Sequence, residues 1–260
     1  MRVAVVGMGE AGRLYAADLV AAGHSVVAFD PAEVSFPDGV EHAGSAASAA
    51  SDAALVVSLT GAGFAEEVAG QVAEAGSGAC VADFNSAGLA TKRAVEAALP
   101  GTPVADVAVL APVPRAGART PLVVSGPGAG RVAEVFGPLG ASVEVLDAEV
   151  GAAAGRKLLR SVFMKGLAAT VLESVSAAES AGCAQWVREQ IAAELGSAEL
   201  VDRLIDGSRQ HASRRVHEMR DCRSYLDEIG ADAEICDASI SWLRWCSAAS
   251  EPVRSWMLSK

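Results

Sequence analysis

The stretch "VAVVGMGEAG", residues 3–12, places three glycines at the spacing GxGxxG directly after a run of β-branched residues. The first glycine permits a tight turn, the second lets the backbone approach a pyrophosphate, and the third allows close packing of a helix on a strand. The N–H groups that open the following helix attract an anion. The stretch therefore predicts a dinucleotide-binding turn. Its candidate cofactor contacts are Gly7, Met8, Gly9, Glu10, Ala11 and Gly12.

A second apolar run, residues 25–30, ends in Asp30. A carboxylate at the end of the second strand accepts hydrogen bonds from ribose hydroxyls and repels a 2′-phosphate. The segment "DPAEVSF" (30–36) contains no arginine that could hold such a phosphate. The sequence therefore predicts NAD as the cofactor, with NADP as the alternative. Asp30 could instead only cap the turn before Pro31.

Short apolar runs alternate with Ala-rich helical stretches through the first half of the chain. Near-continuous apolar strands alternating with helices predict a parallel sheet that is covered on both faces. The segment "APVPRAGARTP" (111–121) breaks the alternation and is expected to be a loop. Strands are expected at residues 2–7, 25–30, 54–59, 79–84, 103–110, 121–126 and 142–146.

The second half of the chain is predicted to be helical. It contains no proline between Asp147 and Ser247, so long helices can run unbroken. Helices are expected at residues 150–181, 184–195, 198–205, 208–229 and 232–247. We therefore expect an α/β, Rossmann-type doubly wound sheet over residues 1–147, followed by an all-α domain over residues 148–260.

The composition narrows the class of protein. Of the 260 residues, 51% are hydrophobic and 20% charged, which is typical of a globular protein, and no apolar run approaches the roughly 20 residues of a membrane helix. The net charge of −11 opposes binding to nucleic acid. The five cysteines include no CxxC pair, so we expect no metal site and a cytoplasmic location. The N-terminus passes directly from a strand into a turn, and no signal peptide is expected.

Four segments carry a resemblance, and they follow one another as "GMGEAG" (7–12), "VSLTGAG" (57–63), "VADFNSAGLATK" (81–92) and "VGAAAGRKLLRS" (150–161). In this order they resemble the β-hydroxyacid dehydrogenase superfamily, which includes 3-hydroxyisobutyrate and 6-phosphogluconate dehydrogenases. The segments "RKLLRSVFMKGL" and "DGSRQHASRRVHEM" further resemble the helical C-terminal domain of a bacterial subgroup called 6-phosphogluconate-dehydrogenase-like. The resemblance implies NAD(P)-dependent hydride transfer on a small-molecule substrate, and a homodimer formed through the helical domain.

The resemblance assigns the catalytic lysine position to Lys157. A lysine on a largely buried helix can pass a proton to or from a substrate hydroxyl, and the small residues 151–155 leave room beside it. Ser161 follows one helical turn later, where many relatives carry asparagine, and can hydrogen-bond a substrate oxygen. Lys157 could instead pack its stem and extend its amine to water.

The remaining candidate residues come from the other matching segments. Leu59, Thr60 and Asn85 are expected to contact the cofactor. Arg115 lies in "VLAPVPRAG" (109–117), where relatives often have a Ser-Gly-Gly loop that binds a substrate carboxylate. The candidate substrate contacts are Ser86, Arg115, Arg160, His211 and His217.

The segment that holds both histidines has a second interpretation. His211 and His217 lie among arginines and acids, and this pattern also fits a solvated helix face with routine ion pairs. The two histidines are six residues apart and share no helical face, so they are not expected to chelate a metal.

The C-terminal tryptophans Trp242, Trp245 and Trp256 are more typical of a core or a dimer interface than of a ligand site. The sequence thus favours an NAD(P)-dependent dehydrogenase. The alternatives are an imine or amine reductase on the same scaffold and a dinucleotide-binding sensor without turnover.

Overall fold

The computed structural model describes residues 1–76 and 78–249. The chain divides into two compact units, of which the first is Met1–Lys157 and the second begins at Leu158. The sequence placed this division near residue 147. The structure adds the start of the long helix α6 (Ala152–Ser180) to the first unit. This follows from its contacts there, because Asp106 accepts hydrogen bonds from the backbone N–H groups of Gly151 and Ala154.

An eight-stranded sheet forms the centre of the first unit, in the order β3-β2-β1-β4-β5-β6-β7-β8. All neighbouring pairs are parallel except β6 and β7, which are antiparallel. The strands are β1 (Arg2–Val6), β2 (Ser25–Phe29), β3 (Val40–His42), β4 (Leu55–Ser58), β5 (Cys80–Asp83), β6 (Val104–Val109), β7 (Leu122–Ser125) and β8 (Val143–Val145). Sequence analysis did not predict β3, because it has only three residues and exposes two of them, Glu41 and His42.

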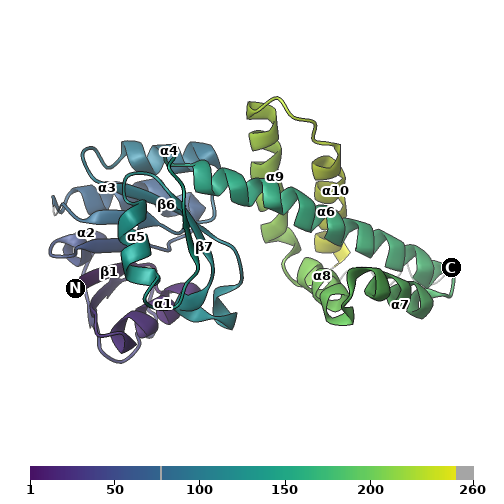
Figure 1. Ribbon diagram of the computed structural model, residues 1–260, viewed down its shortest axis with the longest axis horizontal. Helices are drawn as coiled ribbons and strands as arrows, with labels where there is room; N and C mark the ends of the chain where they lie inside the picture. The colour runs from purple at the N-terminus through teal and green to yellow at the C-terminus, as the bar shows by residue number, and fades with distance from the viewer. Residues whose placement is uncertain (77, 250–260) are drawn as a thin grey trace. The chain divides into compact units, whose positions relative to one another are not determined.

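Helices cover both faces of this sheet, which confirms the predicted fold class (Figure 1). On one face α1 (Glu10–Ala21) and α5 (Ala129–Phe136) share a core in which Tyr15 packs edge-on against Phe84 and Phe136. The other face buries residues of α2 (Ala46–Ala50), α3 (Ala65–Ala73) and α4 (Leu89–Ala97). Three short 3₁₀ helices complete the unit, namely η1 (Ala62–Phe64), η2 (Val113–Arg115) and η3 (Gly117–Arg119).

The strand order reverses between β1 and β4, because β2 and β3 extend the sheet on one side of β1 and β4 to β8 on the other. In open α/β sheets ligands bind at such a reversal, outside the carboxyl ends of the strands. The glycine loop follows β1 directly, and Leu59 and Thr60 follow β4. The topology thus brings two of the predicted cofactor segments to one point of the sheet.

The second unit is helical throughout its described residues, as predicted. After α6, which continues into it from the first unit (Figure 1), come α7 (Ala184–Leu195), α8 (Ala198–Gln210), α9 (Ala212–Glu228) and α10 (Glu234–Ala249). Its core joins Val171 and Leu172 of α6 to Leu204 and Ile205 of α8. Across residues 1–76 and 78–249, no helix combines the length and apolarity that a membrane crossing requires.

One predicted helix break is wrong. We expected the chain to leave the helix at residues 206–207, but α8 continues through Gly207 to Gln210, and the break falls at His211. Gly207 suits the helix interior because a β-carbon there would lie 2.8 Å from a guanidinium nitrogen of Arg215. His211 therefore occupies the N-cap of α9, with an exposed side chain, instead of the interior of a helix.

Candidate active site

The glycine loop has the close approaches that its spacing predicts. Gly7 has φ +98°, and a β-carbon on it would lie 2.5 Å from the carbonyl oxygen of Leu59. A β-carbon on Gly12 would lie 1.9 Å from the carbonyl oxygen of Gly7. Apart from Gly9 and its chain neighbours, no atom of the described residues lies within 4 Å of the β-carbon position of Gly9. The outer glycines are thus required by packing, whereas the middle one leaves the backbone open to a ligand.

Asp30 is fixed by the same loop. One carboxylate oxygen accepts a hydrogen bond from the backbone N–H of Met8 at 2.7 Å, and the other accepts from the N–H of Ala32 at 2.9 Å. The turn-capping interpretation is therefore correct in part. Because each oxygen has a second lone pair, the carboxylate can still accept from ribose hydroxyls.

Arg13 is a cation that sequence analysis missed. It lies on α1, and its guanidinium donates to Ser35 Oγ at 3.3 Å, in the loop that follows Asp30. The segment after Asp30 contains no arginine, whereas Arg13 reaches the same loop from the helix beside it. An arginine near this position accommodates a 2′-phosphate in other dinucleotide-binding folds.

The site fits a dinucleotide on two further observations. No side chain caps the start of α1, so its first N–H groups are available for a phosphate. Thr60 Oγ1 is buried and finds no hydrogen-bond partner among the described residues. A buried hydroxyl needs a hydrogen-bond partner, and a dinucleotide bound at the end of β4 would supply one. In the part of the chain that the structure describes, no three His, Cys, Asp or Glu side chains form a metal-binding group.

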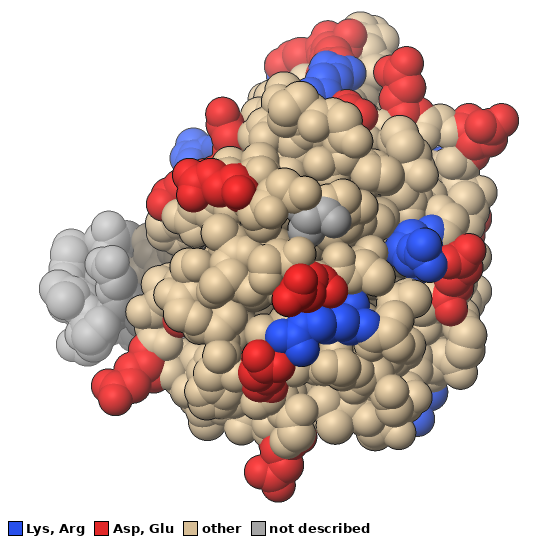
Figure 2. Space-filling view, turned by 90° about the vertical axis from the view of Figure 1, so that its left-hand side faces the viewer, with Lys and Arg blue, Asp and Glu red and all other residues tan. Residues whose placement is uncertain are grey.

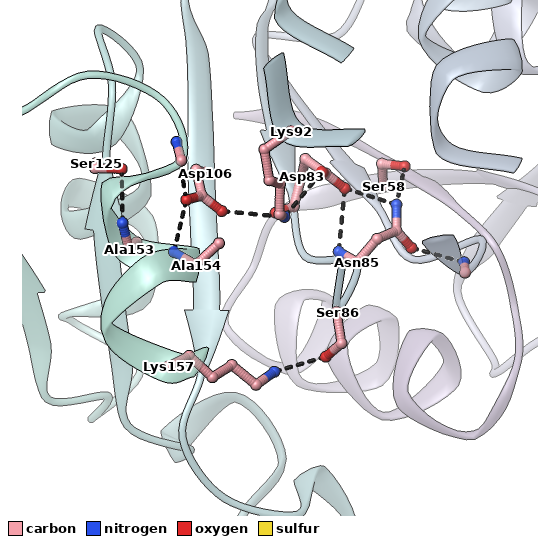
Figure 3. A network of polar contacts seen from close by, with 12 residues as sticks. Ser58, Asp83, Asn85, Ser86, Lys92, Asp106, Ser125, Ala153, Ala154 and Lys157 are labelled. Atoms are coloured by element: carbon pink, nitrogen blue, oxygen red, sulfur yellow. Dashed lines mark hydrogen bonds and ion pairs between the residues drawn. The ribbon is translucent and has the colours of Figure 1, made fainter. Parts of the chain in front are cut away.

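Asn85 ties the ends of β4 and β5 together (Figure 3). Its Oδ1 accepts from the N–H of Gly61 at 2.6 Å, and its Nδ2 donates to Ser58 Oγ at 3.1 Å and to Asp83 Oδ1 at 2.6 Å. The side chain is buried, and both of its N–H donors are used within the protein. The structure therefore gives Asn85 a role in shaping the loop, and only its oxygen retains capacity for a ligand.

Beside Asn85 lies an ion cluster that sequence analysis did not predict. The ammonium of Lys92, on α4, is 2.9 Å from Asp83 Oδ2 and 3.0 Å from Asp106 Oδ1, and all three side chains are at most 2% exposed. Burial lowers the pKa of Lys92, but the two carboxylates outweigh it, so the pKa is raised above its usual value and the lysine stays charged. Removing one member of such a cluster leaves an uncompensated buried charge.

Lys157 meets Ser86 within the first unit. Its Nζ donates to Ser86 Oγ at 2.6 Å, joining the first turns of α6 to the loop after β5 (Figure 3). Lys157 itself is half-buried, and the small residues that precede it, including Ala153 and Ala154, are buried. The structure thus brings together two candidate residues that are far apart in the sequence.

Ser161 and Arg160 lie in the second unit. Ser161 is buried, and its Oγ accepts a hydrogen bond from Lys165 Nζ at 3.2 Å. Lys165 also pairs with Glu218 of α9 at 3.1 Å, and Glu218 is shared with Arg214 at 2.5 Å. Arg160 is exposed. Ser161 is therefore part of an ionic network between α6 and α9.

The other polar candidates are exposed. His217 has its Nδ1 3.0 Å from the carbonyl oxygen of Ser213, one turn earlier on α9. Nearby, burial and the charge of Glu218 raise the pKa of Asp221. In the first unit, Arg115 lies at the end of η2, a segment packed against α1.

On the face of the molecule that Figure 2 shows, acidic side chains are widely spread and basic ones stand mostly beside them.

Two tryptophans of α10 contact each other, and two tryptophans of the second unit are exposed. Trp242 donates to Glu173 Oε2 at 2.8 Å and packs edge-on against Trp245, with ring centroids 5.3 Å apart. Trp186 and Trp245 expose 62% and 53% of their surface. Trp256 lies outside the described residues.

Comparisons with known proteins support the fold. A model of a domain of unknown function, DUF1932, matches residues 178–246. A conserved protein of unknown function with structural similarity to 3-hydroxyacid dehydrogenases superposes with a TM-score of 0.78 at 26% identity, covering 96% of this chain and 98% of that one. A comparison with curated proteins finds no match.

Two more distant structures share the fold. The 3-hydroxyisobutyrate dehydrogenase of Mycobacterium tuberculosis, in a structure with L-serine, has a TM-score of 0.77 at 20% identity and covers 95% of this chain and 94% of its own. A V8 variant of an imine reductase from Myxococcus stipitatus, in complex with NAD⁺, has a TM-score of 0.60 at 16% identity, with coverages of 95% and 94%. The chain shares with these structures a Rossmann-type sheet followed by a helical domain, which confirms the predicted fold class, and the DUF1932 match lies within the helical part of the chain.

Proposed function

We propose that this chain is an NAD(P)-dependent oxidoreductase that transfers a hydride between nicotinamide and a small hydroxy or oxo substrate. One observation carries the proposal. Lys157 Nζ lies 2.6 Å from Ser86 Oγ, on the loop that Asn85 ties to the end of β4. This contact supports the proposal, because it holds an amine that could transfer a proton beside the strand ends at which the glycine loop and Thr60 also lie.

The glycine loop, the start of α1, Asp30 and Thr60 are the residues that would hold the dinucleotide. A bound nicotinamide would supply or accept the hydride. Lys157 would take the proton from the substrate hydroxyl during oxidation and return it to the oxygen during reduction. Ser86 would orient the lysine and the substrate oxygen, because a hydroxyl both donates and accepts hydrogen bonds.

The substrate contacts are proposed more broadly. Ser161 would bind a substrate oxygen, and we propose further contacts from Arg115, Arg160, His211 and His217. The M. tuberculosis neighbour was solved with L-serine, a small hydroxy acid, which supports a substrate of that size. We also propose a cytoplasmic homodimer that forms through the helical unit, with the exposed Trp186 and Trp245 as candidate contacts.

An imine or amine reductase is the second candidate, supported by the fold shared with the M. stipitatus enzyme. Lys157 favours the hydroxy or oxo substrate instead, because loss of this lysine would be the sequence signal for imine chemistry. A third candidate is a sensor that binds the dinucleotide without turnover. The glycine loop alone would be enough for that function.

One experiment separates the three. NADH and NADPH binding is followed by cofactor fluorescence, and turnover is followed by absorbance at the nicotinamide band over a panel of hydroxy acids, oxo acids and imines. We expect turnover with a hydroxy or oxo acid. Turnover with imines alone would favour the reductase, and binding without any turnover would favour the sensor.

A further inference from the structure

A buried lysine that touches neither Lys157 nor Ser86 connects the segments that carry them. Besides its two ion pairs, Lys92 Nζ donates a hydrogen bond to the backbone carbonyl of Asp83 at 2.9 Å. Asp83 ends β5, and Asp106 lies on the neighbouring strand β6. One ammonium is therefore shared by carboxylates that belong to two adjacent strands, each of which leads to a different part of the candidate site.

The first connection runs through Asp106 to α6. While Asp106 Oδ1 faces Lys92, its Oδ2 accepts hydrogen bonds from the N–H groups of Gly151 at 3.1 Å and Ala154 at 2.8 Å (Figure 3). These N–H groups open the helix, and a carboxylate there is favoured by the helix dipole. Lys157 lies less than one turn beyond Ala154, so Asp106 anchors the turn from which Lys157 extends.

The second connection runs through Asp83 to Ser86. While Asp83 Oδ2 faces Lys92, its Oδ1 accepts from the backbone N–H of Asn85 at 3.1 Å and from Asn85 Nδ2 at 2.6 Å. Ser86 is the next residue along the chain. Asp83 thus holds the loop whose hydroxyl contacts Lys157, and the two connections close a circuit through the 2.6 Å contact between Lys157 and Ser86.

We propose that Lys92 is a positioning residue, whose ammonium holds the start of α6 and the loop after β5 together so that Lys157 meets Ser86. Asp83, Asn85, Lys92 and Asp106 are buried, so water does not compete for their hydrogen bonds, whereas the contact between Lys157 and Ser86 is exposed and depends on how the two segments are held. For its effect on turnover the proposal rests on the proposed function, whereas its effect on the two segments does not.

The test removes the ammonium of Lys92 together with one of its carboxylate partners, so that the net charge of the buried cluster does not change. Lys92→Met combined with Asp83→Asn deletes one cation and one anion, and the amide oxygen that replaces the carboxylate can still accept a hydrogen bond from Asn85. The matched control is Leu99→Ala, which opens a cavity in the apolar core next to α4 and leaves the ion cluster intact.

Hydrogen exchange measured by mass spectrometry gives a readout that needs no substrate. In the double variant we expect exchange to accelerate about ten-fold in peptides covering residues 83–88 and 150–157, relative to the core strands β1 and β4. In Leu99→Ala, any acceleration should be shared by the core strands. Equal acceleration everywhere in both variants would overturn the proposal, because Lys92 would then contribute only to general stability.

Kinetics supply the second readout. If the wild-type protein turns over, the double variant should lose about 100-fold in kcat, because a catalytic group displaced by about 1 Å has an effect of that size. The Kd for NADH should change by less than about ten-fold, since the glycine loop and Asp30 are untouched while the loop that holds Asn85 loosens. Wild-type kcat in the double variant would overturn the proposal. A wild-type protein without turnover would instead refute the proposed function, and hydrogen exchange would still decide the role of Lys92.

If the double variant does not fold, Asp106→Asn tests one connection alone, because it keeps the pair of Lys92 with Asp83. We expect faster exchange at residues 150–157 and unchanged exchange at residues 83–88. The reverse pattern, or no change in either peptide, would contradict the proposed linkage.

Discussion

The two units each contain a lysine shared between charged neighbours, and the two clusters differ in burial. In the first unit Lys92, Asp83 and Asp106 are at most 2% exposed. In the second unit Lys165 and Glu218 are 18% and 21% exposed, and Arg214 is 65% exposed. Water screens the second cluster but not the first, so the same kind of contact has different consequences. The buried cluster can fix the geometry of the segments that it joins, whereas the partly exposed one can rearrange.

The largest predicted effect follows from this difference. Lys92→Met should lower the free energy of unfolding by about 3–5 kcal/mol, because it leaves two carboxylates buried without their cation. Lys165→Met should lower it by about 1 kcal/mol or less, because its partners reach water. Urea denaturation of both variants provides the comparison. Equal losses would show that burial does not distinguish the two clusters.

The second prediction compares two glycines of the cofactor loop. Gly12→Ala should lower both stability and dinucleotide affinity, because the new β-carbon overlaps a backbone oxygen and the loop must shift. Gly9→Ala should leave the melting temperature near that of the wild type, since its β-carbon position is open. It should still weaken NADH binding, by about ten-fold or more, if the backbone there contacts the pyrophosphate. Unchanged affinity in Gly9→Ala would place the cofactor elsewhere.

The glycine loop could be predicted from sequence because its determinants are close together along the chain. Gly12 packs on the backbone of Gly7, five residues earlier, and Gly7 follows β1 directly. Asp30 follows the next strand and accepts a hydrogen bond from the N–H of Met8, which fits its predicted place beside this loop, and its contact with a ribose stays a prediction. Arg13 was missed because its partner Ser35 comes from another segment.

Lys92 could not be predicted in the same way, because its partners come from two different strands. A signal was nevertheless present in the sequence. Lys92 shares the buried face of its helix with Val95, and Asp106 lies inside the apolar run "VADVAV". A carboxylate in a buried strand requires a partner, and a lysine on an apolar face can supply it. The break at His211 was misplaced because Gly207 was interpreted as a helix terminator, although its lack of a side chain makes room for Arg215.

The third prediction concerns cofactor choice. Asp30→Ala should weaken NADH binding about ten-fold and reduce the preference for NADH over NADPH, because the carboxylate that repels a 2′-phosphate is removed. Arg13→Ala should weaken NADPH binding more than NADH binding. Fluorescence titration with both cofactors measures each change. A wild-type protein that already prefers NADPH would contradict the role assigned to Asp30.

The smallest effect belongs to Asp221, a half-buried carboxyl near Glu218 in the second unit. Burial raises the pKa of Asp221 in the folded protein, so ionisation of its carboxyl opposes folding. The protein keeps its full stability below the pKa of the unfolded state and loses part of it as the pH rises through the pKa of the folded state. Asp221→Asn should therefore raise the melting temperature at pH 7, by about 2 °C. The difference should vanish below about pH 4, where the wild-type carboxyl is protonated. A variant that is less stable than the wild type at pH 7 would show that the carboxylate is stabilised by its neighbours.

The measurement that tests the account most directly is the turnover of Lys157→Met, followed by absorbance at the nicotinamide band with a substrate of the wild-type protein. Arg131→Met serves as the control, because it also removes one cation from the first unit but lies on α5 and pairs with the exposed Glu134. We predict that Lys157→Met loses about 100-fold to 10,000-fold in kcat. It should keep the wild-type affinity for NADH, and the control should keep both. Wild-type turnover in Lys157→Met would contradict the assignment of Lys157 as the acid/base.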